Sequence, residues 1–383
     1  MVTEKQYDAA IVGGGLAGLA CAIELSRLGH SVVLFEKEQY PFHKVCGEYV
    51  SMESWKYLEQ LGIPLKEMQL PIIDQLLLTA PNGKSLSARL PLGGFGISRF
   101  ALDHHLVNIA KEQGVLVYEE TKVEDVFFDK EFTIQYRRKD SESESCEARV
   151  CYGAFGKRSN LDVKWKRSFL EKQDKKLDNY VAVKYHVQTE WPENVIGLHN
   201  FKNGYCGISR IEEEKYCLCY LTKADALRNC GGDIKRLERE VLSKNKYLKE
   251  IFNNSAVLEE FPITISQVNF QKKTLVENGI MMLGDAAGMI TPLCGNGMSI
   301  ALHTGKIGAA LGKQFLKGEI SREQMEQQYE AQWKKQFGRR LQRGRLLQRF
   351  FGSDRWSNGF VSLFRALPLL AKPVIRMTHG EPF

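Results

Sequence analysis

The chain has 383 residues, of which 43% are hydrophobic and 26% charged, and its formal net charge is +7. These fractions exclude the fibrous and disordered classes of protein. The length is sufficient for two separate domains or for one pair of domains built together. The positive charge favours an anionic partner, which the charge alone leaves open between a cofactor phosphate, an acidic substrate, a lipid surface and nucleic acid.

The beginning of the chain predicts a cytoplasmic protein. Residues 1–8 include Glu4, Lys5 and Asp8 and lead directly into an apolar strand, which leaves no room for an export signal. No apolar run approaches the roughly 20 residues that a membrane-spanning helix needs. Nine cysteines without paired metal spacing suit free thiols in a reducing compartment, and we predict no metal site.

The first motif is a strand, a glycine turn, a helix and a second strand. Residues 7–12 form an apolar run typical of a buried parallel strand, and residues 13–18 read GGGLAG, a G-x-G-x-x-G pattern. A helix pattern follows and ends at Gly29, and the apolar run 31–35 ends at Glu36. Together these elements predict a dinucleotide-binding βαβ unit.

Each part of this motif has a physical role toward a dinucleotide. Gly13 permits the tight turn, Gly15 lets the backbone approach a pyrophosphate, and Gly18 lets helix and strand pack closely. The helix N-terminus favours the phosphates, and an acid about 20 residues further on accepts hydrogen bonds from ribose hydroxyls. The predicted cofactor-binding residues here are Gly13, Gly15, Leu16, Ala17, Gly18, Glu36 and Lys37.

A second motif lies far downstream. The apolar run 279–283 is followed by GDAAG at 284–288 and by PLCGNGM at 292–298. With the first motif, this pattern resembles the flavoprotein superfamily of aromatic-ring hydroxylases, flavin halogenases and geranylgeranyl reductases. The resemblance implies FAD as cofactor, with Asp285 toward the ribityl chain and the second glycine turn toward the flavin. The residues it implies are Gly284, Asp285, Pro292, Gly295, Asn296, Gly297 and Met298.

Two further segments carry the same resemblance. Residues 97–103 read ISRFALD and imply that Arg99 faces the FAD phosphates or ribityl chain, while Val123 is expected near adenine. Residues 41–48 read PFHKVCGE and resemble the P-x-x-x-x-C-G-E segment of geranylgeranyl-reductase-like proteins, which passes near the flavin ring. The cofactor-binding candidates in it are Lys44, Cys46 and Gly47. The catalytic candidates are Cys46 and Glu48.

The expected fold is α/β: a Rossmann-like FAD-binding domain with an inserted antiparallel β-sheet substrate domain and C-terminal helices. We assign residues 1–160 and 271–320 to the FAD-binding domain and 161–270 to the substrate domain, to which 63–98 also contribute. A single helix-like span is expected near 234–248. Residues 321–383 form a C-terminal helical basic segment.

The C-terminal segment contains a basic amphipathic pattern. Trp333, Phe337, Leu341, Leu347 and Phe351 form one helical stripe surrounded by lysines and arginines. We expect this helix to pack on the body of the protein, with peripheral docking on a membrane surface as the alternative. No nucleic acid partner is predicted, because base-stacking aromatics and known modules are missing.

The resemblance implies an FAD-dependent oxidoreductase. We expect a flavin monooxygenase acting on a small hydrophobic aromatic, quinone or polyketide or lipid-like substrate. The first alternative is a geranylgeranyl-reductase-like reductase of isoprenoid double bonds. Further alternatives are a flavin halogenase and a non-catalytic FAD-binding protein. Residues 153–159 read GAFGKRS where ring hydroxylases carry an Asp-Gly pair, so NADPH or NADH stays open as electron donor. The sequence leaves the oligomeric state open.

Overall fold

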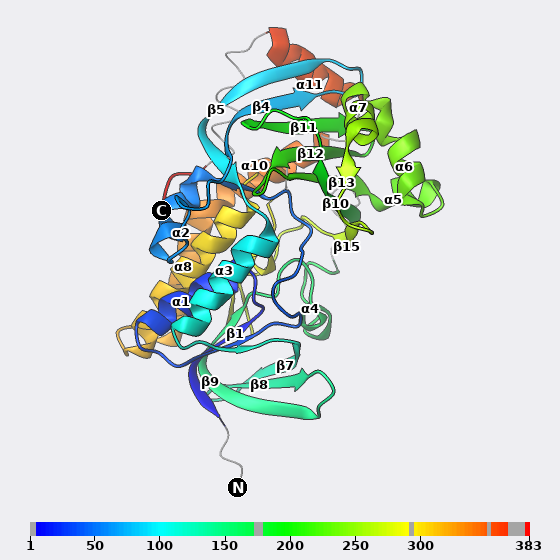
Figure 1. Cartoon of the computed structure of the whole chain (residues 1–383). Helices are drawn as coiled ribbons and strands as arrows, with labels where there is room; N and C mark the ends of the chain where they lie inside the picture. Colours follow the sequence, from blue (N-terminus) through cyan, green and yellow to red (C-terminus); the bar gives the residue numbers. More distant parts are fainter. Residues whose placement is uncertain (1–4, 172–178, 291–294, 351–353, 367–379) are drawn as a thin grey trace.

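The structure is a computed structural model that describes residues 5–171, 179–290, 295–350, 354–366 and 380–383. A mainly parallel sheet with long helices lies next to a second, mainly antiparallel sheet (Figure 1). The α/β class expected from the sequence is therefore confirmed. Among the described helices, none is both long enough and apolar enough to cross a bilayer.

The first sheet contains the glycine-turn motif. Its strand order is β16-β17-β9-β1-β2-β6, and the β7–β8 hairpin joins it through β9. The pairs β1–β2, β1–β9, β2–β6 and β9–β17 are parallel, so the carboxyl ends of these strands meet at one edge. The strands are β1 (Gln6–Val12), β2 (Val32–Phe35), β6 (Leu116–Tyr118), β7 (Thr121–Phe128), β8 (Phe132–Arg138), β9 (Ser143–Gly153), β16 (Val276–Glu277) and β17 (Ile280–Met282).

Helices cover this sheet because its central strands are apolar throughout. The last four residues of β1 and all four of β2 are buried, as is typical of parallel strands that are covered on both faces. The long helices are α1 (Leu16–Arg27), α3 (Arg99–Glu112) and α8 (Gly297–Leu316), which lie side by side in Figure 1, and α1 packs directly on α3 and α8. Shorter helices are α2 (Trp55–Gln60) and α4 (Asn160–Lys164).

The second sheet has the order β14-β10-β13-β12-β11-β4-β5-β3, with β15 also pairing with β10. Its strands come from two parts of the chain, one on either side of β6 to β9. They are β3 (Tyr49–Ser51), β4 (Ile72–Thr79), β5 (Ser85–Gly96), β10 (Tyr180–Gln188), β11 (Val195–Phe201), β12 (Gly204–Arg210), β13 (Tyr216–Lys223), β14 (Ala256–Val257) and β15 (Ile263–Val268).

The two faces of the second sheet differ. Val183 and Tyr185 of β10 pack with Leu237 and Leu248 under the helices on one face. Side chains alternate along a strand, so Ala182, Lys184 and His186 point to the opposite face, toward the first sheet. The helices are α5 (Ala224–Asn229), α6 (Ile234–Glu240) and α7 (Lys246–Asn254).

The prediction of a single helix near 234–248 is wrong. Helix α6 ends at Glu240, a short 3-10 turn covers Leu242–Lys244, and Asn245 then caps α7 by accepting the N–H of Tyr247. The N-cap bond satisfies an otherwise free backbone donor, which favours a new helix start.

The C-terminal stripe packs on the body of the protein. Helix α9 (Arg322–Trp333), a π-helical segment (Lys334–Gly338) and α10 (Arg339–Phe350) follow one another, and α11 (Asp354–Ala366) lies beside β5. Trp333, Phe337 and Leu341 belong to the same buried core as the first sheet. The side chain of Leu347 and all of Phe351 lie outside the described part of the chain.

Candidate cofactor and active site

A cavity of about 810 Å³ runs from the carboxyl edge of the first sheet to the inner face of the second. Most residues predicted to bind the cofactor line it. Gly18 and Asn296 stand outside the lining, and Pro292 falls outside the described residues. The predicted residues in the lining are Gly13, Gly15, Leu16, Ala17, Glu36, Lys37, Lys44, Cys46, Gly47, Glu48, Arg99, Val123, Gly284, Asp285, Gly295, Gly297 and Met298.

The glycine turn places an uncapped helix end at the cavity. Gly13 has φ +110°, and a Cβ there would lie 2.5 Å from the carbonyl oxygen of Ala154. A Cβ at Gly18 would lie 2.1 Å from the carbonyl oxygen of Gly13, so both positions require glycine. Helix α1 begins after Gly15 without a side-chain cap. Its free N–H groups and positive dipole end therefore suit a pyrophosphate.

Glu36 lies at the end of β2, buried beside this turn with 6% of its surface exposed. Its two carboxylate oxygens accept the backbone N–H groups of Gly14, at 2.9 Å, and Glu38, at 3.1 Å. Each oxygen has a second lone pair. The carboxylate is thus fixed in place and can still accept two ribose hydroxyls.

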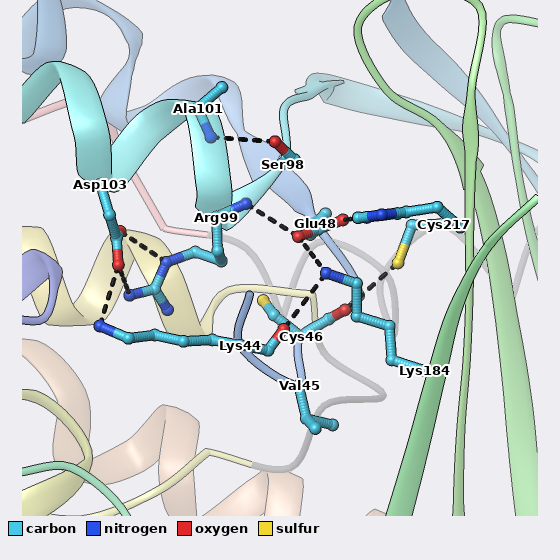
Figure 2. A network of polar contacts seen from close by, with 12 residues as sticks. Lys44, Val45, Cys46, Glu48, Ser98, Arg99, Ala101, Asp103, Lys184 and Cys217 are labelled. Carbon is cyan, nitrogen blue, oxygen red and sulfur yellow. Dashed lines mark hydrogen bonds and ion pairs between the residues drawn. The ribbon is translucent and has the colours of Figure 1, made fainter. Parts of the chain in front are cut away.

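Arg99, Asp103 and Lys44 form a cationic group in which Asp103 is buried and the two cations are partly exposed (Figure 2). Arg99 binds Asp103 through Nε and Nη2, both at 2.8 Å, and Lys44 Nζ lies 3.0 Å from Asp103 Oδ2. Burial raises the pKa of Asp103, but Arg99 and then Lys44 outweigh it, so the pKa lies below its ordinary value. Two cations share one carboxylate, and the net positive charge suits an anionic cofactor.

The segment 44–47 is held by side chains of the second sheet and of the loop after β9. The carbonyl oxygens of Lys44, Val45, Cys46 and Gly47 accept hydrogen bonds in turn. Their donors are Lys184 Nζ of β10 at 3.2 Å, Lys157 Nζ at 3.2 Å, Cys217 Sγ of β13 at 3.2 Å and Ser209 Oγ of β12 at 3.2 Å. This segment therefore has a fixed conformation, which places the half-buried Cys46 in the cavity wall.

Glu48 is bound on every side. It has φ 55° and no exposed surface. Its oxygens face the backbone N–H of Arg99 at 2.8 Å and Lys184 Nζ at 2.5 Å (Figure 2). His186 Nε2 lies 2.7 Å from Glu48 Oε2. Burial raises the pKa of Glu48, but His186 and Lys184 outweigh it and lower the pKa below its ordinary value. An ionised carboxylate with these partners anchors the segment.

The sequence reasoning missed Lys184, His186 and Glu259. His186 Nδ1 lies 2.6 Å from Glu259 Oε1, which extends the network of Glu48 toward the surface. One signal existed in the sequence, since Lys184 and His186 alternate in the otherwise apolar strand YVAVKYHVQ. A charged residue inside such a strand needs a buried partner.

The second motif forms a turn at the same cavity. The side chain of Asp285 lines the cavity, and its carbonyl oxygen accepts Lys273 Nζ at 2.9 Å. Arg167, which is buried, donates to the carbonyl oxygen of Ala286 at 3.1 Å. Helix α8 then begins at Gly297 without a side-chain cap, beside Gly295 and Met298 in the lining. A second positive helix end therefore faces the cavity.

This geometry defines a dinucleotide-binding flavoprotein, because one continuous cavity joins a pyrophosphate turn, a ribose acid and a second helix end. The chain belongs to the FAD binding domain family, whose sequence profile matches residues 6–332. It is an FAD-dependent oxidoreductase, as the sequence predicts. When bound, FAD supplies two-electron redox chemistry in this cavity.

Individual proteins resemble the chain over most of its length. It is 24% identical over 361 residues to conditioned medium factor receptor 1 of Dictyostelium discoideum, covering 88% of this chain and 69% of that protein. It is 24% identical over 394 residues to digeranylgeranylglycerophospholipid reductase 2 of Methanopyrus kandleri, covering 98% and 93%. The solved structure of the flavin-dependent brominase Bmp2 has the same fold, with a TM-score of 0.79, 19% identity and coverage of 98% and 93%.

Proposed function

We propose that the chain reduces carbon–carbon double bonds in a hydrophobic, isoprenoid-like substrate. The observation that carries this proposal is the apolar part of the cavity, which is continuous with the cysteine segment, residues 41–48, and with Lys44 and Arg99. Its lining there includes Ile196, Leu198, Ile208, Leu221, Ile265 and Met289. Such a lining favours a hydrocarbon chain.

Saturation of one double bond needs a hydride at one carbon and a proton at the other. Reduced FAD supplies the hydride when bound. We assign the proton to the thiol of Cys46: its S–H bond breaks as the new C–H bond forms, and the electron pair stays on sulfur. The thiolate then regains a proton from water. An external reductant, with NADPH and NADH as candidates, restores the reduced cofactor.

Two cations interact electrostatically with Cys46. Lys184 is buried, and Arg99 is partly exposed in the cavity lining. Their positive charge faces the negative charge that proton donation leaves on the sulfur. Glu48 acts as a positioning residue, because its oxygens already hold Lys184, His186 and the N–H of Arg99.

The relatives support reduction as the reaction. The named activity of the Methanopyrus kandleri relative, which aligns with nearly the whole chain, is the reduction of a geranylgeranyl lipid. An apolar lining of this kind also suits the aromatic, quinone or polyketide-like substrate of a monooxygenase. Oxygenation is therefore the competing outcome of the test below.

A single-turnover measurement without oxygen tests the proposal. Chemically reduced holoprotein is mixed anaerobically with a geranylgeranyl glycerolipid, and with its fully saturated counterpart as control. We expect flavin absorbance to return to the oxidised form with the unsaturated lipid alone. If the flavin stays reduced until oxygen is admitted and the lipid then gains oxygen, the chain is a monooxygenase.

We further infer that the protein works in the cytoplasm in peripheral contact with an anionic membrane. The described cysteines are free thiols, which suits a reducing compartment. Arg339 and Arg343 of α10 are exposed, and Leu346 beside them is 54% exposed. Basic residues around an exposed leucine favour an anionic lipid surface, where a lipid substrate is found.

A further inference from the structure

Three ligand-type side chains meet beside the cavity from distant parts of the chain. His43 comes from the segment after β2, His186 from β10 and Glu259 from the segment after β14. One nitrogen or oxygen atom of each lies within 4.8 Å of the other two. No spacing rule in the sequence links these positions, because the fold alone brings them together.

His186 and Glu259 are already oriented toward each other. Glu259 Oε2 accepts the backbone N–H of His186 at 2.8 Å, which leaves Oε1 directed at His186 Nδ1, 2.6 Å away. The other ring nitrogen, Nε2, faces the buried carboxylate of Glu48 at 2.7 Å. At these distances both ring nitrogens donate to carboxylates. A metal ion would replace the proton on Nδ1, while Nε2–H would still donate to Glu48, as in metal-binding histidines backed by a carboxylate.

His43 can complete the group from the solvent side. Its side chain is exposed, and its ring lies 5.2 Å from the ring of His186 and stacks on Phe100. One of its ring nitrogens lies within 4.8 Å of the ligand atoms of His186 and Glu259.

We propose that His43, His186 and Glu259 bind one divalent transition-metal ion of the Zn²⁺ class, with water in a fourth position. Two histidines and one glutamate are a known ligand set for such an open tetrahedral site. Metal–ligand bonds of about 2.1 Å place tetrahedral ligand atoms roughly 3.4 Å apart. His186 and Glu259 need to separate by about 0.8 Å, and the exposed ring of His43 moves in.

The charges around the site are compatible with a dication. Lys184, the nearest cation, is neutralised by Glu48 at 2.5 Å. Glu259 then supplies the one anionic ligand. The ion would link the segment after β2 to both β10 and the segment after β14. This proposal is independent of the reaction at the flavin.

Cobalt titration of the full-length holoprotein tests the proposed metal site. After removal of metals with a chelator, the protein is titrated with Co²⁺, whose visible spectrum reports the ligands, and Zn²⁺ is then added as competitor. We expect one Co²⁺ per chain, visible absorption bands of a tetrahedral nitrogen and oxygen site, and displacement by Zn²⁺. A strong near-ultraviolet band from thiolate ligands would place the ion on cysteines and overturn the proposal.

Matched variants assign the ligands. His43→Ala and Glu259→Gln should each weaken Co²⁺ binding at least tenfold, while retained FAD absorbance shows that the variants fold. His104→Ala, which removes an exposed histidine bonded to Asn108, should leave binding unchanged. Glu48→Gln should weaken binding about 10–100-fold, as the loss of a carboxylate behind a ligand histidine does. Unchanged affinity in both His43→Ala and Glu259→Gln would refute the site.

Discussion

Lys184 and Glu48 form an ion pair of 2.5 Å at a place where neither side chain has exposed surface. Lys184 belongs to the second sheet, and Glu48 ends the cysteine segment and also binds the first turn of α3 through the N–H of Arg99. The pair therefore joins the cofactor-binding body to the sheet that covers the substrate part of the cavity.

Removing one charge of this pair should destabilise the protein strongly. Glu48→Gln leaves the ammonium of Lys184 buried without a counterion, which should lower the free energy of unfolding by about 3–5 kcal/mol. Denaturant unfolding of the flavin-free protein measures this difference in the free energy of unfolding. Glu144→Gln, at an exposed pair with Arg138, is the control and should change stability by less than about 0.5 kcal/mol. A loss for Glu48→Gln no larger than the control would contradict this role.

Lys273 should make stability rise with pH in the alkaline range. Burial lowers its pKa from 10.5 to about 8. Between these two pKa values the folded state releases the proton while the unfolded state keeps it, so the free energy of unfolding increases with pH. Below about pH 8 the cost of burying the charged ammonium applies in full. Relative to Lys273→Met, the wild type should gain about 3 kcal/mol between pH 8 and 10.5. Parallel stability curves for the two proteins would show that Lys273 does not titrate there.

Glu36 should contribute to FAD affinity through its charge. Glu36→Gln keeps the size of the side chain but replaces one acceptor oxygen by a donor, which removes charge-assisted hydrogen bonds worth about 1.5–3 kcal/mol each. Reconstitution of the flavin-free protein, followed by flavin fluorescence, should give an affinity about 10–100-fold lower. Glu120→Gln, an exposed residue paired with Lys139, is the control. Equal affinities in both variants would exclude Glu36 from the ribose site.

The basic surface of α10 should govern binding to anionic vesicles. Reversing Arg339 and Arg343 to Glu removes two contributions of about 1 kcal/mol each, so binding should fall at least tenfold. Sedimentation with vesicles of phosphatidylglycerol and phosphatidylcholine measures it. Arg236→Glu combined with Arg239→Glu, two exposed arginines of α6, is the charge-matched control. Binding that is unchanged, or that falls equally in the control, would reject the membrane contact.

The parts of the site that lie in local motifs could be predicted from the sequence. The turn at Gly13, the acid at Glu36 and the turn at Asp285 each follow a strand directly, and a parallel sheet brings strand ends to one edge. Their place at the cavity depends on neighbours in the chain or on this simple topology, so a residue pattern is sufficient to predict it.

The parts that depend on pairing between distant segments could not be predicted. His186 and Glu259 meet because β14 pairs with the end of β10, and Glu48 meets both sheets because β3 joins the second one. No composition or spacing encodes these registers. The break between α6 and α7 was missed for a related reason, since neither glycine nor proline marks it and the cap at Asn245 resembles any polar residue.

The most direct measurement is the mass of the product formed in D₂O. Reduced holoprotein and a geranylgeranyl glycerolipid react under anaerobic conditions, and the lipid is analysed by mass spectrometry. The account predicts two deuterium atoms per saturated double bond, because both the reduced flavin and the thiol of Cys46 exchange their hydrogens with solvent, and a much slower reaction in Cys46→Ala. A lipid that keeps its double bonds without oxygen, and gains an oxygen atom once oxygen is present, would contradict it.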